Sequence, residues 1–557
     1  MSVIVQDRKK RTVNSALWAA FGDAIGFTTE LADKALVKRR TGSASPVSTT
    51  VAWQRLVGGK FGALVDLPAG TYSDDTQLRL ATSRCVRHDG YFDVESLAKI
   101  ELPVWLNYSL GSGLGSKAAA TSLCSSSTTW YSNFFRTEKA TYVQGGGNGA
   151  AMRVQPHVWC AADLSDTHSY LPDVVRNAVA THGHVRGIAG ALLHAVALAF
   201  VFRESRLPTP EEWPDFASAI MQLPSLVQRD SDLKTFWLPT WETESETAID
   251  QAAQAVATEW VDVCGDAARH GLAGKQDYAK LVEHLGGLRP DQRGSGLKSA
   301  LFSLCAAWSM RSHAPGEVLD VVANLLSSDT DTIATMAGAL LGALPNQPEP
   351  SGVVQDKQFI VEDAIRLHDV SMRTTSEDFV YPDLLYWQPP KSPLDALGVM
   401  GGALALQGLG VVEPIGRVFP TRQGETCYQW FRLKSGQTVL CKRRAEPRPM
   451  PTTSLPQPRE ASGRTEHLDP GQRSPERDLF GQGPPAGRSL DLPRERTALT
   501  LDAATDEAIH SNFNANVVGK HLLRFAESDD GLELAVAYAA IVVKARRARL
   551  KKGSGSR

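Results

Sequence analysis

The sequence predicts an all-α protein: a compact helical domain with a small β-rich appendix and, beyond a linker, a C-terminal helical segment. Three observations predict this fold class. Alanine- and leucine-rich stretches with helical spacing recur between residues 13 and 345. Strand-like alternation is scarce over the same residues. No repeat of constant period is visible, which argues against a solenoid. Strand-forming residues concentrate instead after residue 411.

The helical domain is predicted to span residues 13–412. Its clearest helix candidates are residues 14–26, 74–87, 187–202, 249–263, 297–310 and 331–344. Residues 360–412 are expected to add helix and loop that close the same domain. The most apolar run, 187–202, is interrupted by His194 and holds about 16 residues, fewer than a membrane span needs. We therefore predict that it is a buried core helix.

Residues 413–445 form the predicted β-rich appendix. Segments 415–419, 425–433 and 437–443 carry Val, Ile, Phe, Tyr and Trp, which favour strands. The residues 434–436 (KSG) between the last two segments suit a hairpin turn. The appendix is thus expected to contain a hairpin and one further strand.

Residues 446–497 are predicted to be a disordered Pro/Arg-rich linker. Ten of the 31 prolines of the chain lie between residues 446 and 493, with few aliphatic residues. Such a stretch buries too little apolar surface to offset the entropy lost on ordering. Residues 498–557 regain helical character and end in a basic tail. This segment is expected to dock on the main domain, bind a protein partner or touch an acidic surface.

Bulk composition describes a globular protein without a strong charge bias. The 557 residues are 42% apolar and carry a net charge of −2, so no overall field favours a membrane or nucleic acid. The net charge alone does not decide whether the protein binds nucleic acid, and no membrane partner is expected. The seven cysteines are scattered without a CxxC pair, which is typical of reduced thiols in a cytosolic protein. The N-terminal residues lack a signal-peptide pattern, so we predict a cytoplasmic location.

Two short acidic clusters, residues 73–76 (SDDT) and 329–332 (DTDT), are the first candidate site. They offer carboxylates and hydroxyls, the hard oxygen ligands that suit Mg²⁺ or Mn²⁺ rather than zinc. Two such clusters could hold two ions that activate water and fix an oxygen-rich substrate. The alternative is that each cluster is a helix N-cap, since Ser, Thr and Asp are favoured there.

Glycine-rich segments accompany the acidic clusters. They are residues 22–26 (GDAIG) followed by Glu30, residues 113–115 (GLG), residues 145–153 (GGGNGAAMR) and residues 181–184 (THGH). Glycine loops let backbone N–H groups approach phosphate oxygens, especially at a helix N-terminus. Each loop taken singly is just as well a turn, but metals, loops and a histidine together suit a substrate that combines a diphosphate with a ribose.

In order and spacing these motifs resemble the ADP-ribosylglycohydrolase family, which includes the dinitrogenase reductase-activating glycohydrolase. The resembling stretches lie within residues 17–344. The resemblance implies a compact all-α fold with a binuclear centre of two Mg²⁺ (or Mn²⁺) ions at the base of an ADP-ribose cleft. It also implies hydrolysis of the glycosidic bond between ADP-ribose and a modified acceptor, a protein side chain being the expected one.

The resemblance assigns roles position by position. The implied metal ligands are Ser73, Asp74, Asp75, Asp329, Asp331 and Thr332. The implied acid/base candidates are Glu30, Asp74 and Asp75, whose individual roles spacing does not separate. The implied substrate-binding residues are Gly113, Gly115, Gly145, Gly146, Gly147, Asn148, Gly149 and His182. For His182 a hydrogen-bonded structural role is the alternative, and structural roles are expected for His184 and His194.

Departures from the family pattern bear on substrate identity. Ser73 stands where Thr is usual, Ser327 and Ser328 replace two glycines, and Ser116, Lys117 and Ala118 replace residues often occupied by threonine. Asp23 is expected to support the site rather than to ligate a metal. Two functional alternatives therefore stay open: a hydrolase of another ribosyl or nucleotide compound, and a catalytically silent ADP-ribose-binding protein.

Overall fold

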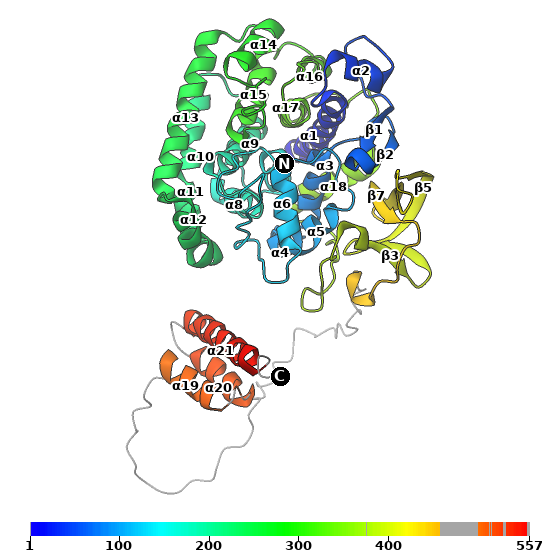
Figure 1. Ribbon diagram of the computed structural model, residues 1–557. Coiled ribbons are helices and arrows are strands. Elements are labelled where there is room, and N and C mark those ends of the chain that lie inside the picture. Colours follow the sequence, from blue (N-terminus) through cyan, green and yellow to red (C-terminus); the bar gives the residue numbers. More distant parts are fainter. Residues whose placement is uncertain are drawn as a thin grey trace, which may run out of the picture. The chain divides into compact units, whose positions relative to one another are not determined.

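The computed structural model describes residues 2–374, 376–456, 500–511, 513, 515–526 and 531–553. The chain divides into two compact units, residues 1–462 and 463–557 (Figure 1). Most of the predicted linker, residues 457–497, lies outside the described residues. The predicted all-α class is confirmed for the main body of the chain, with two additions of β structure described below.

Helices α1 (Ser2–Thr29) and α17 (Thr330–Gly342) form the centre of the first unit. Their backbones approach closely because glycines face the contact. A Cβ on Gly22 would lie 2.3 Å from a backbone oxygen of α17, and a Cβ on Gly338 would lie 2.3 Å from a backbone oxygen of α1. Gly26, near the end of α1, meets the start of α17, so the two helices run antiparallel. The contact therefore brings the end of α1 beside the second acidic cluster.

Further helices surround this pair (Figure 1). They are α2 (Lys34–Thr41), α3 (Asp74–Arg84), α4 (Val94–Ser96), α5 (Leu102–Trp105), α6 (Leu114–Leu123), α7 (Gln155–Trp159), α8 (Leu171–Val179), α9 (Val185–Glu204), α10 (Ala217–Met221), α11 (Leu223–Arg229), α12 (Leu238–Ser245), α13 (Ile249–His270), α14 (Lys275–His284), α15 (Gly296–Ser309), α16 (Pro315–Ala323) and α18 (Lys357–Ser371). All six predicted helices are confirmed, with ends moved by a few residues except in α1 and α13, which are longer. Among the described residues α9 alone is long and apolar enough for a membrane span, but 83% of its most apolar window is buried inside the fold. It is the predicted core helix.

A β-hairpin that the sequence pattern did not predict follows α2. Strands β1 (Trp53–Val57) and β2 (Ala63–Leu67) pair antiparallel, with Arg55 opposite Val65. Trp53, Val65 and Leu67 are buried, whereas Gln54 and Leu64 face outward. The strands are short and separated by glycines, so the alternation of apolar and polar residues is too weak to indicate strands within a helix-rich sequence.

The C-terminal part of the first unit is a five-stranded antiparallel sheet in the order β3-β4-β5-β6-β7. Its strands are β3 (Leu397–Met400), β4 (Ala403–Leu406), β5 (Gly410–Pro420), β6 (Thr426–Leu433) and β7 (Thr438–Arg444). The three predicted strands correspond to β5, β6 and β7. The prediction of helix and loop for residues 360–412 is confirmed for α18, which ends at Ser371, and is wrong from residue 397 on, where β3, β4 and the start of β5 lie. Ala- and Leu-rich residues 397–406 fold as a hairpin since Gly401 and Gly402 adopt left-handed φ angles of 58° and 84°.

The sheet packs on the β1–β2 hairpin and forms part of the same compact unit as the helices. A small core joins them: Phe27, Trp53, Ala63, Val65, Leu67, Leu110, Phe419, Tyr428, Trp430 and Leu440. The indole of Trp430 donates a hydrogen bond of 3.1 Å to the carbonyl of Asp66 on β2. The sheet is therefore a wall of the helical domain and contacts its N-terminal region.

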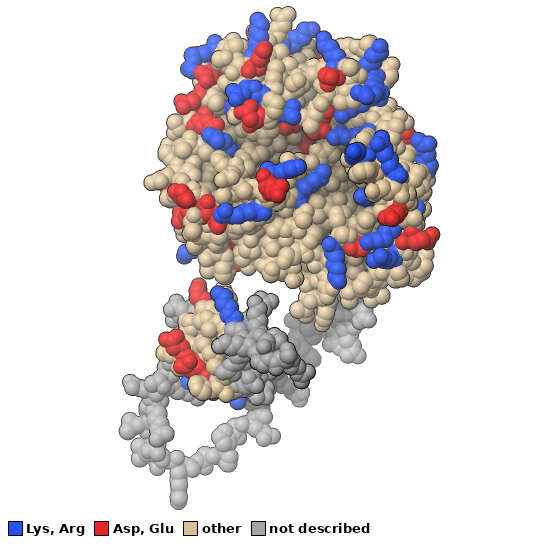
Figure 2. All heavy atoms as spheres, in the orientation of Figure 1, with Lys and Arg blue, Asp and Glu red and all other residues tan. Residues whose placement is uncertain are grey.

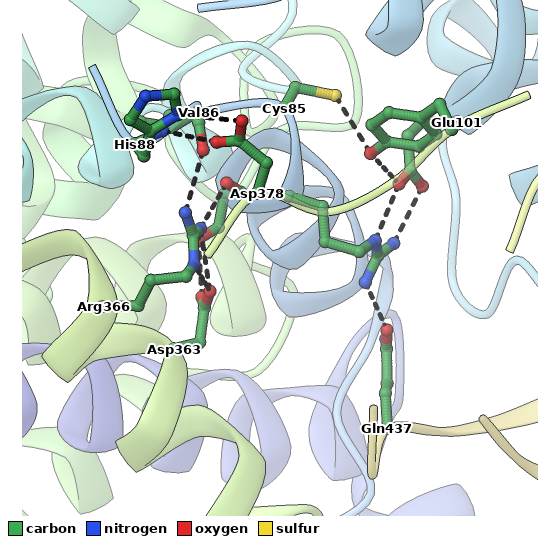
Figure 3. Close-up of polar contacts among 11 residues, drawn as sticks. Cys85, Val86, His88, Glu101, Asp363, Arg366, Asp378 and Gln437 are labelled. Atoms are coloured by element: carbon green, nitrogen blue, oxygen red, sulfur yellow. Dashed lines mark hydrogen bonds and ion pairs between the residues drawn. The ribbon is translucent and has the colours of Figure 1, made fainter. Parts of the chain in front are cut away.

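A buried ion pair connects α3 to this wall (Figure 3). Arg84 donates two hydrogen bonds to the Glu101 carboxylate, at 2.7 and 2.8 Å, and a third to Gln437 before β7. The Tyr381 hydroxyl donates to the same carboxylate at 2.6 Å. Arg84 and Glu101 are almost completely buried. Four residues from separate parts of the chain, Arg84, Glu101, Tyr381 and Gln437, thus meet at one charge pair.

The second unit is a three-helix assembly of α19 (Leu501–His510), α20 (Ala515–Phe525) and α21 (Gly531–Gly553). Its core contains Ala504, Ala508, Phe513, Phe525, Tyr538 and Val542. Buried His521 contacts the Tyr538 hydroxyl at 2.7 Å and a Glu507 carboxylate oxygen at 3.0 Å. The predicted helical character of this segment is confirmed.

Two buried histidines predict acid sensitivity. Burial lowers the pKa of His194 to about 3, and burial together with Arg153 lowers that of His157 to about 3. A neutral buried histidine contributes stability above its unfolded pKa near 6.5 that is lost as pH falls toward the folded value. Between pH 7 and pH 5 each should remove about 2 kcal/mol from the free energy of unfolding.

Urea unfolding at the two pH values measures this loss. His194→Gln is expected to reduce the difference between pH 7 and pH 5 by about 2 kcal/mol, whatever its effect at pH 7. An unchanged difference would contradict the assignment of His194 as a neutral core residue.

Candidate active site

The two acidic clusters, far apart in sequence, meet at the first turns of α3 and α17. The Thr332 hydroxyl lies 3.4 Å from the Asp75 carboxylate, to which it donates. Ser73 caps α3 by accepting a 3.2 Å hydrogen bond from the Asp75 N–H, as the capping alternative expects. Asp329 occupies the N-cap position of α17 without making a side-chain cap bond. Capping therefore explains Ser73 but leaves the Asp329 carboxylate for another role.

Asp23, in the last turns of α1, fixes the start of α3. Its two carboxylate oxygens accept the backbone N–H groups of Ser73 and Thr76, each at 2.8 Å. Both oxygens are thus engaged with the first turn of the helix, and the side chain is fully buried. Asp23 thus holds the backbone turn that carries the carboxylates of Asp74 and Asp75, which is the supporting role expected for it.

The carboxylates of the cluster are crowded and short of cations. Burial raises the pKa of Asp75 well above its usual range, and the charges of Asp23, Asp74 and Asp329 raise it further. Burial, followed by neighbouring carboxylates, does the same to Asp74 and Asp331. The Asp75 Oδ2 atom is buried and has no hydrogen-bond partner among the described residues. The site therefore gathers carboxylates whose charged forms protein groups leave largely uncompensated.

Glu30 follows the last residue of α1 and completes the acidic end. Its carboxylate lies 3.4 Å from the Arg55 guanidinium on β1, and the Arg40 guanidinium donates to its carbonyl at 3.0 Å. Burial raises the pKa of Glu30; Arg55 opposes this rise and Asp329 adds to it. Glu30 is thus the member of the cluster that has a direct cationic neighbour.

A cleft of about 540 Å³ opens over these residues. Its lining includes the predicted residues Glu30, Asp74, Asp75, Gly113, Gly115, Gly145, Gly147, Asn148, Gly149, His182, Asp329, Asp331 and Thr332. Helix α6 begins at the cleft with Gly113 as its N-cap, so the first backbone N–H groups of the helix have no partner within it. One end of the cleft is therefore acidic, and a helix N-terminus supplies donors along its wall.

The glycine loop is held to the second acidic cluster by Asn148. Its side-chain amide donates to Asp329 Oδ2 at 2.9 Å and to the Ser299 hydroxyl at 3.0 Å. Gly149 has no space for a side chain, since a Cβ there would lie 2.7 Å from the Ser116 hydroxyl and 3.0 Å from the His182 ring. The loop thus approaches both the α6 N-terminus and the histidine.

His182 is positioned through Arg153, the last residue of the GGGNGAAMR motif. Buried Arg153 donates to the Gly149 carbonyl at 3.1 Å and to the Thr181 hydroxyl at 2.7 Å. That hydroxyl lies 2.7 Å from His182 Nδ1. Because Thr181 accepts from Arg153, its own proton is free for Nδ1, which favours the tautomer with Nε2–H toward the cleft. Burial and Arg153 lower the pKa of His182 to about 3, so it is a neutral donor.

The family model of the ADP-ribosylglycohydrolases matches residues 5–345. The chain belongs to the ADP-ribosylglycohydrolase family. No curated protein matches the chain at a significant level. One solved structure, an "ADP-ribosylglycohydrolase-related protein complex", covers 66% of this chain and 100% of its own at 19% identity and a TM-score of 0.38. The family assignment rests on the sequence match, which ends before the β-sheet.

Membership in the ADP-ribosylglycohydrolase family indicates a hydrolase of ADP-ribose linkages. Two predicted site residues do not line the cleft. Ser73 is completely buried and caps α3, and Gly146 is absent from the cleft lining, with its carbonyl accepting from the Gly296 N–H at 2.9 Å. Conversely, the segment 135–144 forms a wall of the cleft that the sequence motifs did not mark. It contains no glycine and a single acidic residue, Glu138, instead of the clusters used to find the rest, although Phe135 and Tyr142 give it aromatic character.

The acidic end of the cleft offers oxygen donors, the ligand type that Mg²⁺ and Mn²⁺ prefer. Among the described residues, no three His, Cys, Asp or Glu side chains form a metal-binding group by themselves. Mg²⁺, however, commonly uses one or two carboxylates and retains several waters or substrate oxygens. The partnerless Asp75 oxygen and the uncompensated carboxylates are oxygen donors of this kind. The donor chemistry therefore fits Mg²⁺ or Mn²⁺ in an open, partly hydrated site.

Proposed function

We propose that this ADP-ribosylglycohydrolase is a metal-dependent enzyme that cleaves the glycosidic bond between ADP-ribose and a protein side chain. One observation carries the proposal. The acidic ends of α1, α3 and α17 converge at one end of a cleft that also contains the N-terminus of α6 and the glycine loop. A cleft of about 540 Å³ is within the range that encloses small ligands.

The proposed substrate orientation follows from charge. The ribose that carries the scissile bond is placed at the acidic end, where Asp74, Asp75 and Asp331 lie. The diphosphate is placed at the α6 N-terminus and Gly149, since unpaired N–H groups and the helix dipole attract anions. The neutral His182 is placed to donate its Nε2–H to a substrate oxygen.

Two Mg²⁺ or Mn²⁺ ions are part of the proposal. Ser73, Asp74, Asp75, Asp329, Asp331 and Thr332 would hold them, with Ser73 also acting as the cap of α3. When bound, the cations would hold the ribose hydroxyls in place and lower the pKa of a water near the anomeric carbon.

The residues of the chain provide the remaining steps. Glu30 or one of the aspartates accepts the proton of the attacking water, and a carboxylate or solvent returns one to the leaving group. The anomeric centre develops positive charge as the bond breaks, and the surrounding carboxylates stabilise it. Asn148 maintains the orientation of Asp329 throughout, through the hydrogen bond described above.

The direct test is release of ADP-ribose from ADP-ribosylated arginine, serine and nucleic-acid substrates, each with and without Mg²⁺ or Mn²⁺. Metal-dependent release from a modified protein side chain is the expected result, and chelation should abolish it. Release from nucleic acid or a nucleotide compound alone would favour the alternative substrate class. Absence of release from every substrate, together with absence of metal binding, would overturn the proposal. ADP-ribose binding without release would indicate a silent binding protein.

A cytosolic location and a role for the second unit belong to the same proposal. All seven cysteines are free thiols, as expected for a reducing compartment.

On the three-helix unit, Leu523 and Leu532 are each 71% exposed, which fits a surface for a protein partner. On the face of the chain in Figure 2, lysines and arginines are interspersed with acidic residues. Such mixed charge fits a globular enzyme better than a general nucleic-acid binder.

A further inference from the structure

We propose that Arg55 is a positioning residue that, with Arg40, holds Glu30 at the acidic end of the cleft, and that the C-terminal sheet keeps Arg55 in place. The catalytic part of this inference rests on the proposed function. The structural part, a clamp on Glu30, stands on contacts among the described residues.

Glu30 sits where the backbone leaves α1 abruptly. Its N–H still donates to the Gly26 carbonyl at 2.8 Å, but the next residue, Leu31, has a left-handed φ of 51°. A non-glycine residue in this region is strained and persists where its surroundings enforce it. The Leu31 side chain is 53% exposed, so burial holds little of it in place. The direction of the Glu30 side chain therefore depends on other contacts.

Two arginines make those contacts, one with the backbone and one with the side chain of Glu30. Arg40, in α2, donates to the carbonyls of Thr28 and Glu30 at 2.9 and 3.0 Å. Arg55, in β1, places both terminal nitrogens 3.4 Å from Glu30 Oε2. One arginine thus holds the backbone of the turn and the other faces its carboxylate.

Aromatic rings fix the two guanidinium groups. The Arg55 guanidinium lies 4.4 Å from the centre of the Phe27 ring, and that of Arg40 lies 5.0 Å from the Trp53 ring. Phe27 and Trp53 meet edge to face at 5.3 Å. Cation–π contacts of this kind orient a planar guanidinium more strictly than a flexible ammonium. The arginines are thereby held against Glu30.

The sheet supports this arrangement from behind. Trp53 belongs to the same buried core as Phe419, Tyr428 and Trp430, which come from β5 and β6. The backbone N–H of Arg422 donates to the Gly62 carbonyl in the β1–β2 turn at 3.3 Å, in addition to the Trp430 bond to Asp66. These strands lie beyond residue 345, where the family match ends. The sheet therefore contributes to the site through the hairpin that carries Arg55.

A surface ion pair without function is the competing interpretation. Such pairs add little to stability, and Arg55 retains about a fifth of its side-chain exposure. Both interpretations predict a small change in melting temperature when Arg55 is replaced. They differ in turnover, because supporting residues around a catalytic group commonly change activity about 10- to 100-fold.

The test compares Arg55→Met and Arg55→Lys in the full chain with Arg206→Met as the matched control. Arg206 also pairs with a carboxylate, at 2.6 Å from Glu212, and lies 4.9 Å from the Phe200 ring, but it is remote from the cleft residues. Arg55→Met should lower kcat about 10- to 100-fold with a smaller change in KM, and Arg55→Lys should recover part of it. Trp430→Phe, which removes the bond to Asp66, should give a smaller loss in the same direction. Arg206→Met should match the wild type.

Amide hydrogen exchange tests the clamp independently of activity. Peptides that cover residues 28–33 should exchange faster in Arg55→Met than in the wild type or Arg206→Met. Unchanged kcat in Arg55→Met, or equal losses in Arg55→Met and Arg206→Met, would overturn the catalytic part. Unchanged exchange would overturn the clamp. A wild-type protein that releases no ADP-ribose would overturn the proposed function instead, and exchange would still decide the clamp.

Discussion

Asp75→Asn is expected to reduce ADP-ribose release by about 10³-fold or more while making the metal-free protein more stable. The loss follows from removal of a carboxylate proposed to hold a cation that is worth several kcal/mol in the transition state. The gain follows from the crowding of Asp75 by other carboxylates and from its partnerless oxygen. An asparagine has nearly the same shape, and its amide can donate to a neighbouring carboxylate.

Thermal unfolding and activity measure the two effects together. The metal-free variant should melt about 1 °C above the metal-free wild type, in line with a gain near 1 kcal/mol in a unit of this size. Mg²⁺ should raise the melting temperature of the wild type far more than that of the variant, because ligand that binds only the folded state stabilises it. Asp262→Asn, at an exposed residue of α13 that is not part of the cleft lining, is the matched control. Full activity in Asp75→Asn would remove Asp75 from the ligand set.

The second large effect is expected at the buried ion pair of Figure 3. Arg84→Met should lower the free energy of unfolding by about 3–5 kcal/mol, since it leaves the Glu101 carboxylate buried without its cation. Glu101→Gln should have an effect of similar size through the unpaired guanidinium. Urea unfolding at neutral pH measures both.

A double variant separates charge pairing from simple loss of packing. Arg84→Met combined with Glu101→Leu should recover much of the loss, because neither buried charge remains. Recovery should be incomplete, since Tyr381 and Gln437 each lose a hydrogen-bond partner. Single variants within about 1 kcal/mol of the wild type would show that water reaches and solvates the pair.

The sequence predicted the helices well where their apolar periodicity was long. The α9 run and the α17 stretch are examples, and both are buried along most of their length. Helix ends were less certain because capping depends on local side chains and on tertiary contacts. The β1–β2 hairpin was missed, since its strands of five residues derive their stability from the distant sheet rather than from local alternation.

The candidate site was predictable in its chemistry and less so in its geometry. Oxygen-rich clusters and glycine loops are local signals, and the fold brings nearly all of them to one cleft. Which member of a motif faces the cleft depends on the phase of a helix turn, so Ser73 could not be distinguished from Asp74 by type alone. The Arg55–Glu30 contact depends on a tertiary approach between α1 and the hairpin, which no spacing reveals.

The glycine contact between α1 and α17 makes helix register a determinant of the active site. At Gly22 and Gly338 a backbone oxygen of the other helix occupies the space that a side chain would need. The two helices therefore pack this closely in a single register. Inserting one residue between Gly26 and Glu30, or between Asp331 and Gly338, would advance the affected carboxylate by about 1.5 Å and rotate it by about 100°. The distance between the acidic groups is thus set by residue count along two helices. Sequence length in these segments should consequently tolerate far less change than residue identity on their outer faces.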